Sequence, residues 1–389
     1  MNKGKMKNRS RNIRNRIIIS GGGTGGHVFP AIAIADALKE RIPEVDILFV
    51  GAQDRFEMEK VPEAGYRIEG LPVAGFKRKL SLGNITVIIK LFISLRMANR
   101  IIKEFDPDVV IGVGGYASGP VLRAAAVKGI PTLIQEQNSF AGITNKLLAK
   151  KASRICVAYN GMEKYFPMDK IVITGNPVRK EFKKIKSEEL RSEGYNFFGL
   201  DENLKTLLVM GGSLGARTIN TGVMKNIDQL RDSGIQILWQ CGKYYNDIAK
   251  NAIEKSVAGN IILKDFITRV ELAYAVADVI ISRAGAITIS ELCYAGKPAI
   301  LVPSPNVAED HQTKNAMALV NKSAAICIAD NEAAERMISE ALELLNDQER
   351  LEKMSQNILS MAVEDSAGRI AKEVIRLMEF GVQDRGLSG

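Results

Sequence analysis

Cysteine and long apolar runs are scarce in this sequence, and each shortage limits what the protein can be. The chain of 389 residues has four cysteines, scattered and without the spacing of a metal site, at Cys156, Cys241, Cys293 and Cys327. We therefore expect reduced core cysteines in a cytoplasmic protein, and no metal site. No uncharged apolar run reaches the roughly 18 residues that a membrane span requires, so no segment is predicted to cross a bilayer.

Acidic residues are absent from the first 16 positions, where the positive charge of the chain is concentrated. Of the 53 basic residues seven lie there, so the remaining 46 face 44 acids and the rest of the chain carries only +2. Such a basic arm is typically disordered, with contact to anionic lipid or RNA as the alternative. No RNA-binding signature follows it, and we expect no nucleic-acid partner. The apolar residues 17–19 are too few for a signal peptide.

A glycine-rich stretch at 17–30 opens the ordered part of the chain. Three isoleucines at 17–19 are typical of a buried strand, five glycines follow by position 26, and Pro30 suits the first turn of a helix. A strand, a glycine loop and a helix N-terminus together direct backbone N–H groups at one point, which attracts phosphate. The spacing of Gly21, Gly23 and Gly26 fits a dinucleotide fingerprint, although a tight turn also favours glycine for steric reasons. His27, one of two histidines, stands at the loop exit.

Apolar strands alternate with helices along the chain, which predicts α/β architecture with parallel sheets covered on both faces. Ligands of such sheets bind beyond the carboxyl ends of the strands. The composition becomes charged and turn-rich at 181–205, and a new strand and glycine loop start at 206. We therefore predict two Rossmann-like domains facing across a cleft. Their ranges are 17–180 and 206–365, with an arm at 1–16, a linker at 181–205 and a helix at 366–380 packing on the outside.

The segment 71–103 has no acidic residue and mixes apolar with basic side chains. A wholly buried helix would show such apolarity on nearly every face. The flanking cations favour the alternative, an interfacial patch on an anionic membrane. The predicted patch residues are Lys77, Arg78, Lys79, Ile85, Ile88, Ile89 and Phe92.

Two stretches of the second half carry polar groups suited to a nucleotide sugar. Thr288 and Ser290 can offer hydroxyls and backbone N–H groups to a diphosphate, and Glu291 can accept two ribose hydroxyls, although this is also a helix-capping pattern. Further on, Asp, His, Gln and Asn fall within six residues at 310–315. Such side chains suit sugar hydroxyls, which need both donors and acceptors, and a polar helix cap is the alternative.

Taken together, a series of short motifs resembles the MurG family, the N-acetylglucosaminyltransferases of peptidoglycan synthesis. The motifs occur in the family's order and spacing over roughly 17–380, as Gly22-Gly-Thr-Gly-Gly-His27, Gly114-Gly-Tyr-Ala-Ser-Gly119, Glu136-Gln-Asn138, Gly175-Asn-Pro-Val-Arg179, Gly211-Gly-Ser213, Arg283-Ala-Gly-Ala-Ile-Thr-Ile-Ser-Glu291 and Gln312-x-x-Asn315. The resemblance implies an inverting, metal-independent GT-B glycosyltransferase without a cofactor. It would move N-acetylglucosamine from UDP-N-acetylglucosamine to the 4-hydroxyl of the muramyl sugar in lipid I, giving lipid II.

The acceptor implied by the resemblance, an undecaprenyl diphosphate, lies at the inner membrane face. We therefore expect a peripheral enzyme on the cytoplasmic face of the cell membrane, with other cell-wall synthesis proteins as candidate partners. A related glycolipid synthase with a diacylglycerol acceptor is an alternative, against which the loops at Gly114 and Glu136 argue. A dinucleotide-binding oxidoreductase would need an acid closing the second strand, and Asp54 is poorly placed for that role.

The resemblance also implies functional residues. In the implied donor site Ile267 pairs with uracil through its backbone, and Glu291 holds the ribose. Gln312 and Asn315 read the sugar, and the Thr24 loop can equally cradle the acceptor diphosphate. The residues carried over are Thr24, Gly25, Gly26, Asn138, Arg179, Ser213, Ile267, Ala286, Ile287, Thr288, Ile289, Ser290, Glu291, Gln312 and Asn315.

Inversion requires a base that takes the acceptor proton, and charge stabilisation on the departing UDP. Helix N-termini and Arg179 can provide the stabilisation. His27 is the first candidate base because its ordinary pKa is near neutrality, and a hydrogen-bonded loop histidine is the alternative. The sequence has Gln135 where a common family pattern has histidine, and glutamine cannot act as a base. Glu136 is the second candidate.

Overall fold

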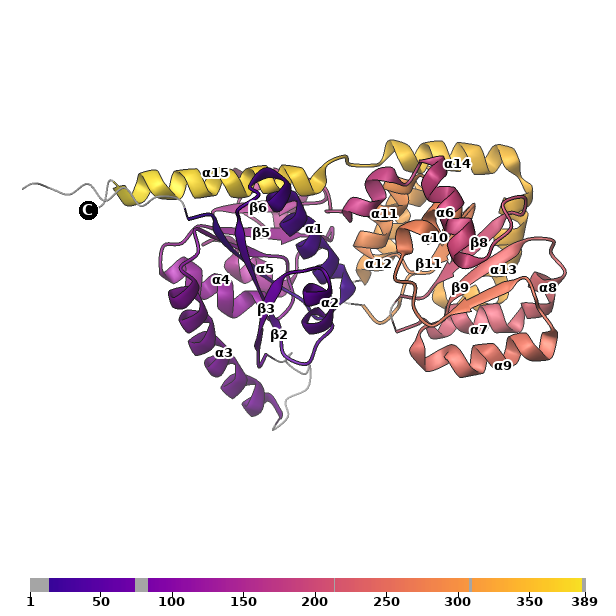
Figure 1. Ribbon diagram of the computed structural model, residues 1–389, viewed down its shortest axis with the longest axis horizontal. Helices are drawn as coiled ribbons and strands as arrows, with labels where there is room; N and C mark the ends of the chain where they lie inside the picture. Colours follow the sequence, from indigo (N-terminus) through magenta and orange to yellow (C-terminus); the bar gives the residue numbers. More distant parts are fainter. Residues whose placement is uncertain (1–13, 74–82, 213, 308–309, 387–389) are drawn as a thin grey trace, which may run out of the picture. The chain divides into compact units, whose positions relative to one another are not determined.

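The computed structural model describes residues 14–73, 83–212, 214–307 and 310–386, with side chains at 83–85 and 380–386 excepted. The chain divides into two compact units, one formed by Met1–Pro177 with Asp365–Gly389 and the other by Val178–Glu364. Each unit is built on one parallel sheet (Figure 1). The prediction of two Rossmann-like parallel-sheet domains is confirmed.

Unit 1 contains a seven-stranded sheet in the order β3-β2-β1-β4-β5-β6-β7. Its strands are β1 (Arg16–Ser20), β2 (Asp46–Ala52), β3 (Arg67–Leu71), β4 (Val109–Gly112), β5 (Thr132–Glu136), β6 (Arg154–Val157) and β7 (Ile171–Ile173). Ile18 of the central strand lies opposite Leu48 on one side and Val110 on the other. Helices cover both faces, which explains why these strands are apolar throughout rather than alternating.

The helices of unit 1 form two layers. They are α1 (Gly25–Arg41), α2 (Glu57–Glu63), α3 (Gly83–Phe105), α4 (Ser118–Val127), α5 (Ile143–Ala149) and α15 (Ser366–Gly386), with single turns at η1 (Met162–Lys164) and η2 (Met168–Lys170). One core joins Ile34 of α1 to Ile370 and Val374 of α15, and the two helices lie side by side (Figure 1). The C-terminal helix therefore supplies core residues to unit 1. The other core gathers α3, α4 and α5 on the opposite face.

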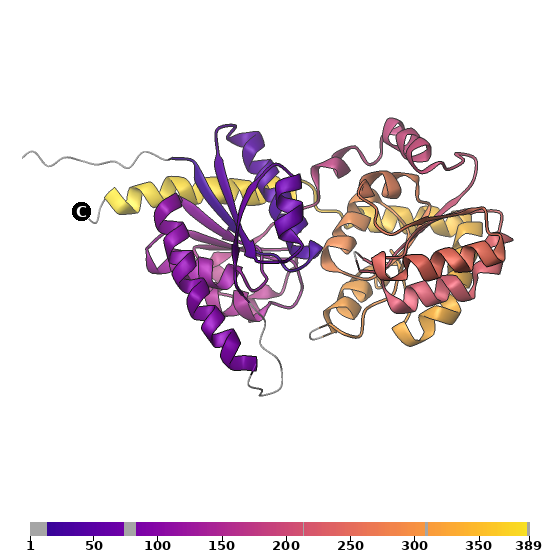
Figure 2. The same cartoon turned by 60° about the horizontal axis from the view of Figure 1, so that its bottom comes forward.

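Unit 2 contains a six-stranded sheet in the order β10-β9-β8-β11-β12-β13, with helices on both faces (Figure 2). Its strands are β8 (Thr206–Met210), β9 (Gln236–Gln240), β10 (Ile261–Lys264), β11 (Val279–Ser282), β12 (Ala299–Leu301) and β13 (Ile326–Cys327). Its helices are α6 (Glu188–Phe198), α7 (Arg217–Lys225), α8 (Ile227–Arg231), α9 (Asn246–Ser256), α10 (Val270–Val276), α11 (Ala286–Ala295), α12 (His311–Val320), α13 (Asp330–Asn346) and α14 (Gln348–Ser360), with turns η3 (Lys180–Lys184) and η4 (Lys243–Tyr245).

The stretch 181–205, predicted as a linker, is part of unit 2. Within it, Phe182, Tyr195 and Phe198 are buried in the core that also contains α10. The boundary lies instead between Pro177 and Val178. The charged composition of this segment conceals the few apolar side chains that attach it to the sheet.

The helix α3 is not wholly buried, so the buried-helix alternative for this segment does not hold. Ala98, Ile101 and Ile102 in its second half pack into the core. Ile89 and Phe92, in contrast, expose 53% and 64% of their surface. Among the described helices, none combines the length and the apolar character that crossing a bilayer requires.

Candidate active site

The glycine loop of unit 1 joins β1 to the N-terminus of α1 at the carboxyl edge of the sheet. Thr24 has an extended backbone and precedes the first helical residue, Gly25. Its carbonyl accepts hydrogen bonds from the N–H groups of His27 and Val28, each at 3.1 Å. His27 therefore lies in the first helical turn, together with Gly25 and Gly26, where unpaired N–H groups and the helix dipole favour an anion.

A buried glutamate holds this loop in place. Glu57, the first residue of α2, accepts one hydrogen bond from the N–H of Gly23 at 2.8 Å and another from the N–H of Ala52 at 2.9 Å. A Cβ atom on Gly22 would collide with the Glu57 carboxylate. The glycine at position 22 thus makes room for the carboxylate. Glu57 was not predicted from the sequence, because nothing in the spacing of α2 relates it to the loop.

Two glycines that follow β4, Gly114 and Gly115, lie against the imidazole of His27 and the glycine loop of unit 1. Gly114 and Gly115 have φ values of +96° and +82°, a region that favours glycine. A Cβ atom on Gly114 would lie 2.8 Å from Cε1 of His27, and one on Gly115 would collide with the carbonyl oxygen of Gly22. The family motif at 114–119 therefore begins with glycines that allow the two loops to touch.

The environment of His27 favours the neutral ring. Burial lowers the pKa of His27 because the charged imidazolium would lose its hydration, and the carboxylate of Glu136 is the largest opposing influence. Nδ1 is buried and has no hydrogen-bond partner among the described residues. A neutral imidazole at working pH is what a general base requires.

Both carboxylate oxygens of Glu136, the second candidate base, accept hydrogen bonds from residues that follow it in the chain. It ends β5 and is buried, and its Oε1 accepts a hydrogen bond from the N–H of Asn138 at 3.1 Å. Its Oε2 accepts from the N–H of Gly142 at 2.9 Å and from Nδ2 of Asn145 at 2.8 Å. The carboxylate thus organises the loop that presents Asn138, and the geometry favours His27 as the base. That assignment stays a prediction.

In unit 2, the N-terminus of α11 carries the predicted diphosphate and ribose residues 286–291. Gly285 precedes the helix with an extended backbone, and Ile287 and Ile289 are buried. Glu291 is also buried and pairs with Arg179, whose Nη2 and Nε lie 3.3 and 3.4 Å from Oε1. Burial raises the pKa of Glu291, and the charge of Arg179 opposes that rise. Two residues predicted to contact different parts of the donor therefore contact each other.

A buried glutamine at the end of β9 connects two other predicted donor contacts. Nε2 of Gln240 donates to the carbonyl of Gly212 at 3.0 Å, and Oε1 accepts from the N–H of Ile267 at 2.9 Å. The backbone N–H of Ile267 is therefore already hydrogen-bonded. A uracil that pairs with this residue would donate to the backbone carbonyl oxygen of Ile267. Ser213 lies outside the described residues. Gln240 was not predicted, and its only sequence signal is a polar residue directly after an apolar strand.

The predicted sugar-reading residues of α12 have different surroundings. Asn315 is buried, and its Nδ2 donates to the carbonyl of Ala284 at 3.1 Å, which fixes the loop before α11. Gln312 accepts at Oε1 from the N–H of Ser304 at 2.8 Å. Gln312 also lines a pocket, so of the two it is the one placed to meet a ligand there.

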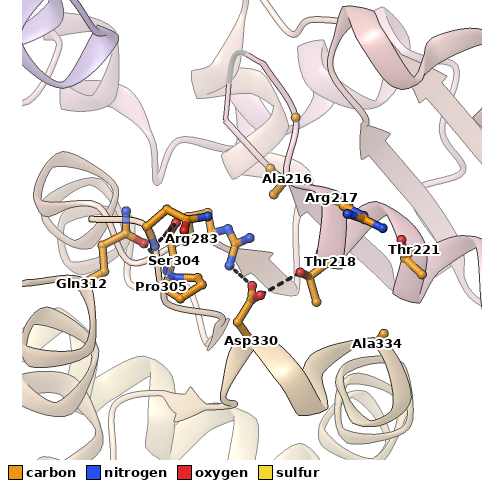
Figure 3. Close-up of a pocket in the computed structure, with 13 residues that line it drawn as sticks. Ala216, Arg217, Thr218, Thr221, Arg283, Ser304, Pro305, Gln312, Asp330 and Ala334 are labelled. Atoms are coloured by element: carbon orange, nitrogen blue, oxygen red, sulfur yellow. Dashed lines mark hydrogen bonds and ion pairs between the residues drawn. The ribbon is translucent and has the colours of Figure 1, made fainter. Parts of the chain in front are cut away.

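This pocket, shown in Figure 3, has a volume of about 680 Å³ and a largely polar wall. Asp330 at the start of α13 accepts hydrogen bonds from Nη1 of Arg283 and from Oγ1 of Thr218, the latter at 2.9 Å, and so joins the loop after β11 to the first turn of α7. The lining residues are Gly211, Gly215, Ala216, Arg217, Thr218, Thr221, Arg283, Ser304, Pro305, Asn306, Gln312, Asp330 and Ala334. Two guanidinium groups and the N-terminus of α7 suit an anionic polar ligand.

The two parallel-sheet domains with their glycine-loop sites are those of a sugar transferase, as matches to glycosyltransferase models in both domains show. Residues 17–157 match the glycosyltransferase family 28 N-terminal domain, and residues 206–370 match the glycosyltransferase family 28 C-terminal domain. Among the residues that the structure describes, no cluster of His, Cys, Asp and Glu is placed to hold a metal ion.

More closely, the chain belongs to the MurG family, as its motifs predicted. It is 56% identical to a relative from Parabacteroides distasonis over 94% of this chain and 98% of the relative. It is 53% identical to one from Porphyromonas gingivalis over 96% of this chain and 98% of the relative. Both relatives are named UDP-N-acetylglucosamine–N-acetylmuramyl-(pentapeptide) pyrophosphoryl-undecaprenol N-acetylglucosamine transferase.

Solved structures agree with this assignment. MurG of Acinetobacter baumannii superposes with a TM-score of 0.71 at 27% identity, over 93% of this chain and 99% of that chain. A UDP-GlcNAc 2-epimerase from Neisseria meningitidis, solved with UDP-GlcNAc, reaches a TM-score of 0.64 at 16% identity, over 93% of this chain and 99% of that one. The epimerase shares the fold alone. The predicted GT-B class is thereby confirmed.

Proposed function

We propose that the protein transfers N-acetylglucosamine from UDP-N-acetylglucosamine to the C4 hydroxyl of the muramyl sugar in undecaprenyl-diphosphate-linked lipid I, forming lipid II for peptidoglycan synthesis. The observation that carries this proposal is the 53–56% identity, over nearly the whole chain, to relatives named for this reaction. Those names specify a muramyl acceptor, so a diacylglycerol acceptor is not favoured.

The donor binds to unit 2 in this proposal. The ribose hydroxyls bind Glu291 in competition with Arg179, and the N-terminus of α11 meets the diphosphate. Gln312 faces the pocket of Figure 3, where we place the sugar-diphosphate end of the donor. The glycine loop at 24–26 and Asn138 belong to unit 1, where a second phosphate group, that of the acceptor, suits the N-terminus of α1.

The proposed reaction needs no group beyond the two substrates and this chain. Nε2 of His27 takes the proton of the acceptor hydroxyl while that oxygen attacks the anomeric carbon. The bond between the anomeric carbon and the diphosphate oxygen breaks, and the configuration inverts. Arg179 and the N-terminus of α11 stabilise the charge that develops on UDP.

A transfer assay tests this function directly. Protein incubated with radiolabelled UDP-N-acetylglucosamine and a lipid I analogue, with a chelator and no added metal, should move label into the lipid fraction. A parallel reaction with diacylglycerol should not. No transfer to the muramyl lipid, or transfer only with added metal, would contradict the proposal.

We also propose that the exposed part of α3 binds the cytoplasmic face of an anionic membrane peripherally, where the lipid-linked acceptor would be reached. Ile88, Ile89 and Phe92 are exposed, and Lys90 lies among them. Apolar side chains flanked by cations are typical of interfacial binding. Lys77, Arg78, Lys79 and the side chain of Ile85 lie outside the described residues. Other cell-wall synthesis proteins stay candidate partners.

Substitution of two residues on this surface should release the protein from lipid. The double substitution Ile88→Glu and Phe92→Glu should weaken binding to phosphatidylglycerol vesicles by more than about tenfold, because burying each apolar side chain is worth roughly 1.5–3 kcal/mol. Vesicle co-sedimentation measures this. The matched control is Tyr244→Glu with Ile248→Glu in unit 2, two side chains that are likewise 77% and 58% exposed. Unchanged binding of a folded Ile88/Phe92 variant would refute the proposed membrane surface.

A further inference from the structure

A chain of buried amides lies behind His27. Nε2 of Gln137 donates to the carbonyl oxygen of Val113 at 2.7 Å and to Oε1 of Gln135. Nε2 of Gln135 donates to Oδ1 of Asn176 at 3.2 Å, and Nδ2 of Asn176 donates to the backbone carbonyl of Gln137 at 3.0 Å. All three amide side chains are buried.

Two backbone carbonyls fix the orientation of these amides, because a carbonyl oxygen only accepts hydrogen bonds. The carbonyl of Gln137 requires the NH₂ group of Asn176, so Oδ1 of Asn176 faces Gln135 and requires a donor from it. Oε1 of Gln135 then faces Gln137, whose NH₂ group also serves the carbonyl of Val113. Flipping any one amide would set oxygen against oxygen or NH₂ against NH₂.

This arrangement leaves one amide oxygen, Oε1 of Gln137, without a hydrogen-bond donor. Both N–H bonds of the Gln137 amide are used, and its Oε1 is buried without a hydrogen-bond partner among the described residues. Nδ1 of His27 is likewise buried without a hydrogen-bond partner among the described residues. The Val113 carbonyl and the Gln137 side chain each raise the pKa of His27, as an acceptor that faces a ring N–H does.

We infer that Gln137 is a positioning residue: its Oε1 accepts the Nδ1–H of neutral His27, so the proton stays on Nδ1 and the lone pair of Nε2 faces the acceptor hydroxyl. This inference rests on the proposed function, in which His27 is the base. Nε2 is then the ring nitrogen that takes the proton, and Gln137 determines that choice. A histidine base works only in the tautomer whose bare nitrogen faces the substrate.

The tautomer can be observed without any turnover. Long-range ¹H–¹⁵N spectra of ¹⁵N-histidine-labelled protein separate protonated from bare ring nitrogens. The chain has two histidines, so His311→Ala assigns the signals. The native protein above the pKa of His27 should have a protonated Nδ1 and a bare Nε2. Gln137→Met should shift the neutral ring toward the Nε2–H form.

A matched control separates this effect from general loss of stability. Gln236→Met removes another buried glutamine with several hydrogen bonds, the first residue of β9 in unit 2, and it should leave the His27 tautomer unchanged. An Nε2–H tautomer in the native protein would overturn the inference. So would an unchanged tautomer in a folded Gln137→Met variant.

Kinetics provide the second readout. Gln137→Met should lower kcat by about tenfold to a hundredfold, a part of the roughly 10²–10⁴ that general base catalysis contributes, with KM for the donor nearly unchanged. In a His27→Ala background the same substitution should have no further effect on kcat. Additive losses would overturn the inference. Full activity of His27→Ala, with the expected tautomer still present, would instead refute the base assignment.

Discussion

The His27→Ala variant should turn over about 10²–10⁴-fold more slowly than the native protein, because it lacks the group that takes the acceptor proton. KM for UDP-N-acetylglucosamine should change little, since the donor binds to unit 2 in our proposal. Steady-state transfer of label to a lipid I analogue measures both constants. A variant that keeps native turnover would exclude His27 as the base and leave Glu136 as the candidate.

The pH profile should report the same residue. Burial lowers the pKa of His27, so kcat/KM should rise with pH through an apparent pKa below the ordinary histidine value and level off above it. His27→Ala should lose this acid limb, whereas His311→Ala should keep it. The lowered pKa also means that the folded state binds fewer protons than the unfolded state between the two pKa values. Stability should therefore fall as pH drops through that window.

The second large effect is expected at the buried carboxylate of unit 2. Glu291→Ala should raise KM for UDP-N-acetylglucosamine by at least about a hundredfold, because it removes two charged hydrogen bonds to ribose of roughly 1.5–3 kcal/mol each. kcat at saturating donor should fall much less, since the ribose does not change during the reaction. Initial-rate measurements over a wide donor range measure the two effects.

An altered donor distinguishes ribose binding from a purely structural ion pair. The native protein should bind a 2′-deoxy donor more weakly than UDP-N-acetylglucosamine, and Glu291→Ala should no longer discriminate between them. If Glu291 served only to hold Arg179, both proteins would discriminate equally and Arg179→Met would reproduce the KM effect. Arg179→Met should in addition destabilise unit 2 by about 3–5 kcal/mol, because it leaves a buried carboxylate without its cationic partner.

The architecture was predictable from sequence because buried parallel strands are apolar throughout and are followed by glycine loops. The loop at 21–26 and the start of α11 lie where this pattern placed them. Contacts between distant residues were not predictable. Arg179 and Glu291 are 112 positions apart, and their ion pair depends on η3 and α11 packing on the same core. Glu57 and Asp330 were not predicted because they, too, contact residues distant in the sequence.

Gln135 illustrates how a departure from a family pattern can be understood only in three dimensions. From the sequence, glutamine in place of histidine meant the loss of a possible base. In the structure Gln135 donates to Asn176 and accepts from Gln137. Neutral histidine also offers one donor and one acceptor, so glutamine can keep the hydrogen-bond direction without any capacity to exchange protons.

The helix α15 has a consequence for how the protein is made. Because Ile370, Val374 and Met378 belong to the core around α1, unit 1 is discontinuous in the chain, whereas unit 2 is one uninterrupted segment, Val178–Glu364. Domains generally fold as units during synthesis. On the ribosome, the nucleotide-sugar half can therefore mature first. The unit that carries His27 cannot complete its core until α15 has been synthesised.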